Sequence, residues 1–214
     1  MKELYIIGAS GFGREVAWLV ERINELNSTW SIQGFIDDDR EKWGHIVSGY
    51  PVLGGCDFFN TINHNVWVVC AVGSAKIRKK IIDKISSYQN IRFPVLIDPD
   101  AKISNRVSID EGTIICAGNI ITVDISIGKH NIINLDCTIG HDAILKNYVT
   151  LYPSVNVSGN TVINSGCELG TGTHIIQGKT IGNNTIIGAG AVVIRDIPAE
   201  SVAVGNPAHV IKSN

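Results

Sequence analysis

The chain has 214 residues, of which 44% are hydrophobic, and this is enough material for one large or two small domains. A formal net charge of −2 excludes a broad basic surface, so nothing favours nucleic acid as a partner and a small molecule is expected. Five cysteines without a CxxC pair predict buried apolar fillers rather than a disulfide framework. Residues 1–7 lead straight into an apolar strand with no leader pattern, so we expect a cytoplasmic protein without membrane insertion.

The first 90 residues alternate short apolar runs with helical patterns. A predicted strand at 4–7 is followed by a glycine-rich loop at 8–13 and an amphipathic helix. Further strands are predicted at 32–36 and 66–72, and a second helix at 75–86. Strands that alternate with helices indicate a small, parallel, Rossmann-like α/β domain. Its ligands are expected beyond the carboxyl ends of the strands, where the glycines and aspartates fall.

A six-residue repeat fills the rest of the chain. Every sixth residue from Ile103 to Val193 is Ile, Leu or Val. This period fits a triangular coil in which three hexads make one turn, so residues three hexads apart lie in one column and turns rise by about 4.8 Å. Pro94 and Pro99 mark the transition. We therefore predict an α/β domain at 1–97 and a parallel β-helix with a C-terminal cap at 98–214.

The union of these motifs resembles the hexapeptide-repeat sugar acetyltransferases, in particular the family of sialic-acid O-acetyltransferases and bacillosamine-pathway (UDP-4-amino-sugar) N-acetyltransferases. The resemblance spans the chain, and its motifs are Ile6–Gly13, Phe35–Asp38, Ala71–Gly73, Ile77–Lys80, Asn134, Ile139–Asp142, Ser158–Asn160 and Val204–Ala208. It implies left-handed winding of the β-helix, acetyl-CoA as co-substrate, no metal, and a homotrimer with acetyl-CoA in the groove between neighbouring coils.

Acetyl transfer needs a base for the acceptor's proton and a donor for the oxyanion. Of six histidines, only His141 precedes a carboxylate, Asp142, which can orient the imidazole. The family's catalytic histidine also aligns there, whereas His130 and His174 are expected to be surface residues. Gly159 follows His141 by three hexads, so it is expected one turn above, and the family assigns the matching glycine to oxyanion stabilisation. The alternatives without a catalytic role are a surface histidine at a corner for His141 and a left-handed turn residue for Gly159.

The resemblance also places residues beside acetyl-CoA. These are Thr150, Gly159, Gly170, Thr171, Ala189 and Gly190. Family members often carry a second histidine where this chain has Thr150, which is a departure from the family pattern.

In the first domain, the glycine loop reads G-x-x-G-x-G rather than the dinucleotide order G-x-G-x-x-G. The predicted acceptor-site residues are Ser10, Gly11, Phe12, Asp37, Asp38 and Gly73. Loop N–H groups at a helix N-terminus suit a nucleotide diphosphate, and the aspartates suit ribose or a base edge. A tight strand-to-helix turn and solvated aspartates are the alternatives. Family members often have histidine at the position of Phe12, which is a second departure from the family pattern. The basic run 78–80 is expected to be a solvated helix face.

The leading hypothesis is an acetyl-CoA-dependent N-acetyltransferase for the 4-amino group of a nucleotide-linked amino-dideoxy sugar, used in surface glycan or glycoprotein synthesis. The enzyme alternative is O-acetylation of a sialic acid or a related sugar hydroxyl. A third hypothesis, a non-catalytic β-helix scaffold or glycan-binding trimer, does not require the His141–Asp142 pair.

Overall fold

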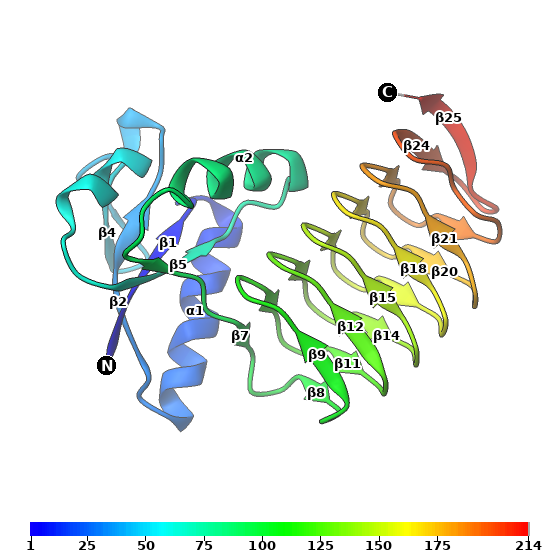
Figure 1. Cartoon of the computed structure of the whole chain (residues 1–214), viewed down its shortest axis with the longest axis horizontal. Coiled ribbons are helices and arrows are strands. Elements are labelled where there is room, and N and C mark those ends of the chain that lie inside the picture. The colour runs from blue at the N-terminus through cyan, green and yellow to red at the C-terminus, as the bar shows by residue number, and fades with distance from the viewer. Residues whose placement is uncertain (214) are drawn as a thin grey trace. The chain divides into compact units, whose positions relative to one another are not determined.

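The computed structural model describes residues 1–213, which divide into two compact units (Figure 1). The first comprises Met1–Gly73 and Ile77–Pro99; the second comprises Ser74–Lys76 and the described residues from Asp100 onward. The predicted domain boundary after residue 97 stays a prediction.

The first unit is built on a six-stranded sheet in the order β3-β4-β2-β1-β5-β6, parallel except for the β3–β4 hairpin. Its strands are β1 (Lys2–Ile7), β2 (Trp30–Ile36), β3 (Ile46–Val47), β4 (Tyr50–Gly54), β5 (Val66–Cys70) and β6 (Ile91–Arg92). Its helices are α1 (Gly11–Leu26), α2 (Ala75–Ile85) and the short 3-10 helices η1 (Arg40–Lys42) and η2 (Cys56–Thr61), and β7 (Leu96–Ile97) follows them. The Rossmann-like prediction is confirmed, although β3, β4, β6 and both 3-10 helices were not predicted.

The turn between β1 and α1 requires its glycines. Gly8 has a φ of +100°, and a Cβ on Gly13 would lie 1.8 Å from the Gly8 carbonyl oxygen. Because only glycine allows this approach, α1 begins tightly against the end of β1. The helix then buries Val16, Ala17, Leu19 and Val20, whose spacing defines its apolar face.

The second unit is a coil of three parallel sheets and forms a left-handed β-helix. The hexads predict the coil, and the family resemblance implies its left-handed winding. One sheet contains β10 (Ile114–Ile115), β13 (Ile132–Ile133), β16 (Thr150–Leu151), β19 (Glu168–Leu169), β22 (Ile186–Ile187), β24 (Ser201–Val204) and β25 (His209–Ser213). The next contains β8 (Lys102–Ile103), β11 (Ile120–Ile121), β14 (Thr138–Ile139), β17 (Asn156–Val157), β20 (His174–Ile175) and β23 (Val192–Val193). The third contains β9 (Val107–Ile109), β12 (Ile125–Ile127), β15 (Ile144–Leu145), β18 (Val162–Ile163) and β21 (Thr180–Ile181). An antiparallel pair, β24 with β25, closes the coil.

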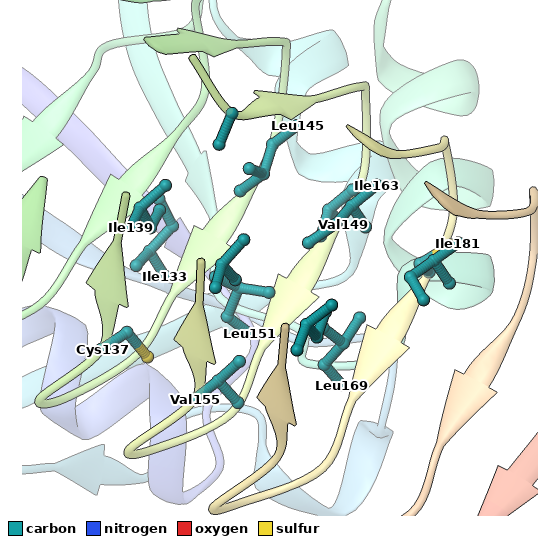
Figure 2. Close-up of a cluster of buried hydrophobic side chains, with 14 of the residues drawn as sticks. Ile133, Cys137, Ile139, Leu145, Val149, Leu151, Val155, Ile163, Leu169 and Ile181 are labelled. Carbon is teal, nitrogen blue, oxygen red and sulfur yellow. The ribbon is translucent and has the colours of Figure 1, made fainter. Parts of the chain in front are cut away.

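Neighbouring turns pair in the predicted register of three hexads. Ile121 lies beside Ile139, and Ile139 lies beside Val157. The inward hexad residues from Ile115 to Val193 are all buried, and Figure 2 shows part of this stacked aliphatic core. A column of large apolar side chains thus fills each face of the coil and fixes which turn residues lie above one another.

The corners of the coil repeat one backbone conformation. A positive φ recurs at every sixth residue from Gly112 to Gly190, and the non-glycine positions are mostly Asp, Asn and Ser. Short polar side chains tolerate this left-handed conformation better than other residues. Asp142 occupies one of these positions with a φ of +59°, so its place at a corner follows from the repeat.

Candidate functional site

His141 and Asp142 form the predicted pair at one corner of the β-helix. The His141 Nδ1 lies 2.8 Å from the Asp142 Oδ2, and both side chains are about half exposed. An ionised carboxylate can only accept a hydrogen bond, so this contact fixes Nδ1 as the donor. In the neutral tautomer of the ring, Nε2 then carries the lone pair that a general base needs.

Gly159 lies directly against this imidazole. A Cβ on Gly159 would lie 2.6 Å from both the Cε1 and the Nε2 of His141, and the Asn160 N–H donates to the His141 carbonyl at 2.8 Å. Gly159 does not have a positive φ; Asn160 does, with 55°. The left-handed-turn interpretation of Gly159 is therefore wrong, and glycine is needed here because the histidine ring occupies the space of a side chain.

The Gly159 amide is a candidate donor for an oxyanion. In the described part of the chain, its N–H donates to no acceptor, whereas its carbonyl accepts from the Gly178 N–H at 3.0 Å. An amide donor beside the Nε2 of an oriented histidine is the combination that acyl transfer requires. The structure thus brings His141, Asp142 and Gly159 together as predicted.

The predicted acetyl-CoA residues lie elsewhere on the coil. Thr171 and Ala189 stand one circuit apart and share a corner with Gly170 and Gly190, and the strands of the β8 sheet separate this corner from that of His141. Thr171, Ala189 and Gly190 are exposed. Thr150 lies on β16 of another face and is buried. One chain therefore does not gather the catalytic residues and these residues at a single corner.

The carboxylate of Asp37, at the end of β2, is hydrogen-bonded to groups of the protein itself. It accepts the Ala9 N–H at 2.9 Å, the Asp39 N–H at 3.0 Å and the Lys42 ammonium at 3.0 Å. Partial burial alone would raise the pKa of Asp37, but these donors outweigh it and hold the pKa below its ordinary value. Asp37 therefore fixes the glycine loop to the end of β2.

This contact predicts an acid-dependent stability. A carboxyl group whose pKa is lower in the folded than in the unfolded state stabilises the fold above a pH of about 4. This stabilisation is lost as the pH falls through the folded pKa. Asp37→Asn is expected to lower the free energy of unfolding of the first unit at pH 7, with the gap to wild type closing as the pH approaches 2. Urea titrations followed by tryptophan fluorescence measure this unit, because all four tryptophans lie in it. Exposed Glu15→Gln is the control, and a gap independent of pH would contradict the prediction.

Asp38 faces a cavity beside the ends of β2 and β4. Its Oδ1 accepts the Cys56 N–H at 2.9 Å. The cavity has a volume of about 390 Å³, and its lining residues include Asp38, Arg40, Trp43, Gly55, Phe58 and Lys84. It offers carboxylate acceptors, cationic donors and aromatic surface within the first unit. Apart from Asp38, the sequence analysis missed these residues. Arg40 and Phe58 lie on η1 and η2, which are too short to show a periodic pattern, whereas Lys84 lies on the predicted helix α2 and nothing in the local sequence marks it as a cavity residue.

The remaining predicted acceptor residues lie at the same sheet edge. Ser10 precedes α1 in an extended conformation, Gly11 is the exposed first residue of the helix, and Phe12 is half-buried. Gly73 follows β5 in the loop that leads to α2. A Cβ on Gly8 would lie 3.0 Å from the Ala71 oxygen, so this loop and the glycine loop are in contact.

Two interpretations of charged or polar residues are wrong. Arg78 is not on a solvated helix face: it is 1% exposed and donates to the carbonyls of Val72 and Gly73. His130 is not on the surface: it is 4% exposed, and its ring stacks on Tyr148, with 5.3 Å between centroids. His174 is exposed on β20, as predicted. In both wrong cases a tertiary contact, invisible in the local pattern, decides burial.

Within residues 1–213, no three His, Cys, Asp or Glu side chains are grouped so as to hold a metal ion. No helix in this range is sufficiently long and apolar to cross a bilayer.

Comparison with known proteins reveals similar chains. Residues 3–85 match the family described as the PglD N-terminal domain. A perosamine N-acetyltransferase mutant from Caulobacter crescentus, solved with CoA and GDP-perosamine, is 28% identical and superposes with a TM-score of 0.90 over 99% of this chain and 98% of its own. The acetyltransferase domain of PglB from Neisseria gonorrhoeae, solved with acetyl coenzyme A, is 31% identical with a TM-score of 0.89 over 98% and 99%.

Curated relatives match part of the chain. The serine acetyltransferase of Bacillus licheniformis is 28% identical over 155 residues, which are 71% of this chain and 64% of that protein. The chain spans less than two thirds of the length of such relatives. The matches to solved structures, in contrast, extend over both chains almost completely. Together with the fold and the His141 corner, they show that the chain belongs to the hexapeptide-repeat family of acetyl-CoA-dependent sugar N-acetyltransferases.

Proposed function

We propose that this protein transfers the acetyl group of acetyl-CoA to the 4-amino group of a nucleotide-linked amino-dideoxy sugar, in the cytoplasm, for surface glycan or glycoprotein synthesis. The observation that carries the proposal is the His141 imidazole, oriented by Asp142 at 2.8 Å and seated against Gly159. The similarity to a perosamine N-acetyltransferase solved with GDP-perosamine supports the choice of acceptor class.

In this mechanism, Gly159 acts on the thioester carbonyl and His141 acts on the acceptor amine. The acceptor amine attacks the thioester carbonyl, and the Gly159 N–H stabilises the oxyanion. His141 Nε2 takes the proton of the amine while Asp142 stabilises the imidazolium. Collapse of the intermediate breaks the C–S bond, and His141 returns the proton to the departing thiolate, giving the amide and CoA. The buried cysteines do not serve as acyl carriers, since burial raises the pKa of Cys137 to about 12 and that of Cys167 to about 11.

Each unit has its own role in the proposal. Residues 1–97 bind the nucleotide of the acceptor through Ser10, Gly11, Phe12, Asp38 and Gly73, with Asp37 holding the loop. The cavity beside Asp38 supports this role, because carboxylates and cations together match the polar edge of a base. Residues 98–214 carry catalysis and bind acetyl-CoA.

A homotrimer completes the site in this proposal. Gly170, Thr171, Ala189 and Gly190 lie at a different corner from His141, and acetyl-CoA bound between two copies of the coil would contact the catalytic corner of one copy and these residues of the other. Thr150 is buried, so the proposed contact at Thr150 requires local movement.

A thiol-release assay tests the function. Acetyl-CoA is offered with UDP-, GDP- and dTDP-linked 4-amino sugars, with free amino sugars and with sialic acids, and CoA is quantified with a thiol reagent. All five cysteines of the protein are buried, so the background reaction of the folded protein is expected to be low. Release is expected only with a nucleotide-linked amino sugar. Release with sialic acids alone would replace the proposal by O-acetylation, and silence on every acceptor would replace it by a scaffold function.

A further inference from the structure

Arg78 is a buried charge near the start of α2. It is 1% exposed and is the largest fully buried side chain among the described residues. Burial of a guanidinium is unfavourable, and so is a cation in the first turn of a helix. Arg78 therefore stands where helix stability alone disfavours it.

The contacts of Arg78 lead back to the loop after β5. Its Nη1 donates to the carbonyl oxygens of Val72 and Gly73, at 2.7 Å and 2.9 Å. In a planar trans peptide, the C=O and the N–H point in opposite directions. With the Val72 carbonyl turned toward Arg78, the Gly73 N–H points away from it. Two charge-assisted hydrogen bonds thus set the orientation of consecutive peptide groups in this loop.

The same loop is packed against the glycine loop. The Ala71 N–H donates to the Ile7 carbonyl at 2.8 Å, and a Cβ on Gly8 would reach to 3.0 Å from the Ala71 oxygen. The Gly73 peptide group, whose orientation Arg78 sets, therefore lies at the edge of the sheet where we propose the acceptor site.

We propose that Arg78 is a positioning residue for acceptor binding: it holds the Val72–Gly73 loop in the conformation that receives the diphosphate of the nucleotide sugar. This inference rests on the proposed function for the identity of the acceptor. The effect of Arg78 on the acceptor is expected through the two carbonyl groups that it holds, not through contact with a substrate. The surface of the helix, including exposed Lys80, has no such role.

The test is a comparison of Arg78→Lys with Lys80→Gln. Lysine keeps the charge but lacks the planar donor geometry that holds both carbonyls. Arg78→Lys is expected to raise the KM for the nucleotide amino sugar at least tenfold, with kcat and the KM for acetyl-CoA changing less than twofold. The Kd for UDP or GDP, whichever the wild type binds, is expected to rise by the same factor in calorimetry. Lys80→Gln is expected to leave all four constants unchanged.

An acceptor KM within twofold of wild type for folded Arg78→Lys would overturn the inference, as would a loss confined to kcat. Should Arg78→Lys fail to fold, the wild-type protein provides the test. Hydrogen exchange at the Gly73 amide is expected to slow at least tenfold with saturating UDP or GDP, and unchanged exchange would overturn the inference. Failure of the proposed function is distinguishable, since it appears as wild-type silence in the thiol-release assay.

Discussion

Replacing His141 by alanine is expected to lower kcat by about a hundredfold or more, the usual worth of a positioned general base. The Nε2 of His141 is the accessible basic nitrogen beside Gly159, and Asp142 alone does not reach the same position because it lies on the opposite side of the ring. The Kd for acetyl-CoA is expected to change little, since the imidazole binds the proton of the acceptor rather than the body of the co-substrate. Steady-state kinetics and calorimetry with acetyl-CoA measure the two quantities.

The matched control for this change is His174→Ala. His174 is an exposed histidine of the same coil on β20, and its removal is expected to leave kcat unchanged. Near wild-type turnover by His141→Ala would remove this residue from the mechanism, whatever the acceptor.

Gly159→Ala is expected to lower kcat to a similar extent by displacing the base. The added Cβ would lie 2.6 Å from two atoms of the His141 ring, so the ring must move away from its bond with Asp142 or the turn must shift. Either movement separates the imidazole from the oxyanion donor. Because the two changes damage one unit, the double variant is expected to be barely worse than either single variant, and kinetics of all three proteins measure this.

Gln177→Ala provides the control for Gly159→Ala, because residue 177 is exposed at the same corner, one circuit further along the coil. Its kcat is expected to match the wild type. A fully active Gly159→Ala would show that the glycine is there for backbone packing alone. Additive losses in the double variant would show that His141 and Gly159 act independently.

The periodic part of this molecule was predictable because one rule generates it. An inward aliphatic residue at each sixth position fixes the register, and the register alone placed Gly159 next to His141. The reason for glycine at 159 was not accessible from sequence. It follows from the rotamer of His141, which places the ring where a side chain would stand.

The first unit was less predictable because its site is made by short, irregular segments. The cavity beside Asp38 is lined partly by η1 and η2, and neither has enough residues for a periodic signal. Asp37 and Asp38 are adjacent and chemically identical, yet one is saturated by Ala9, Asp39 and Lys42 while the other lines the cavity. Arg78 has the sequence environment of an exposed basic run, and its burial depends on carbonyls that fold back to it.

The three-hexad register also limits how the length of this coil can vary. His141 and Gly159 form one corner because a full circuit separates them. An insertion or deletion of one hexad between them would preserve every inward aliphatic position and every left-handed corner, so the coil would still fold. It would, however, carry Gly159 to the next corner and separate the oxyanion donor from the base. Length changes between the two residues are therefore compatible with folding when they come in steps of one hexad. The corner that joins His141 and Gly159 stays intact only if their separation remains one circuit.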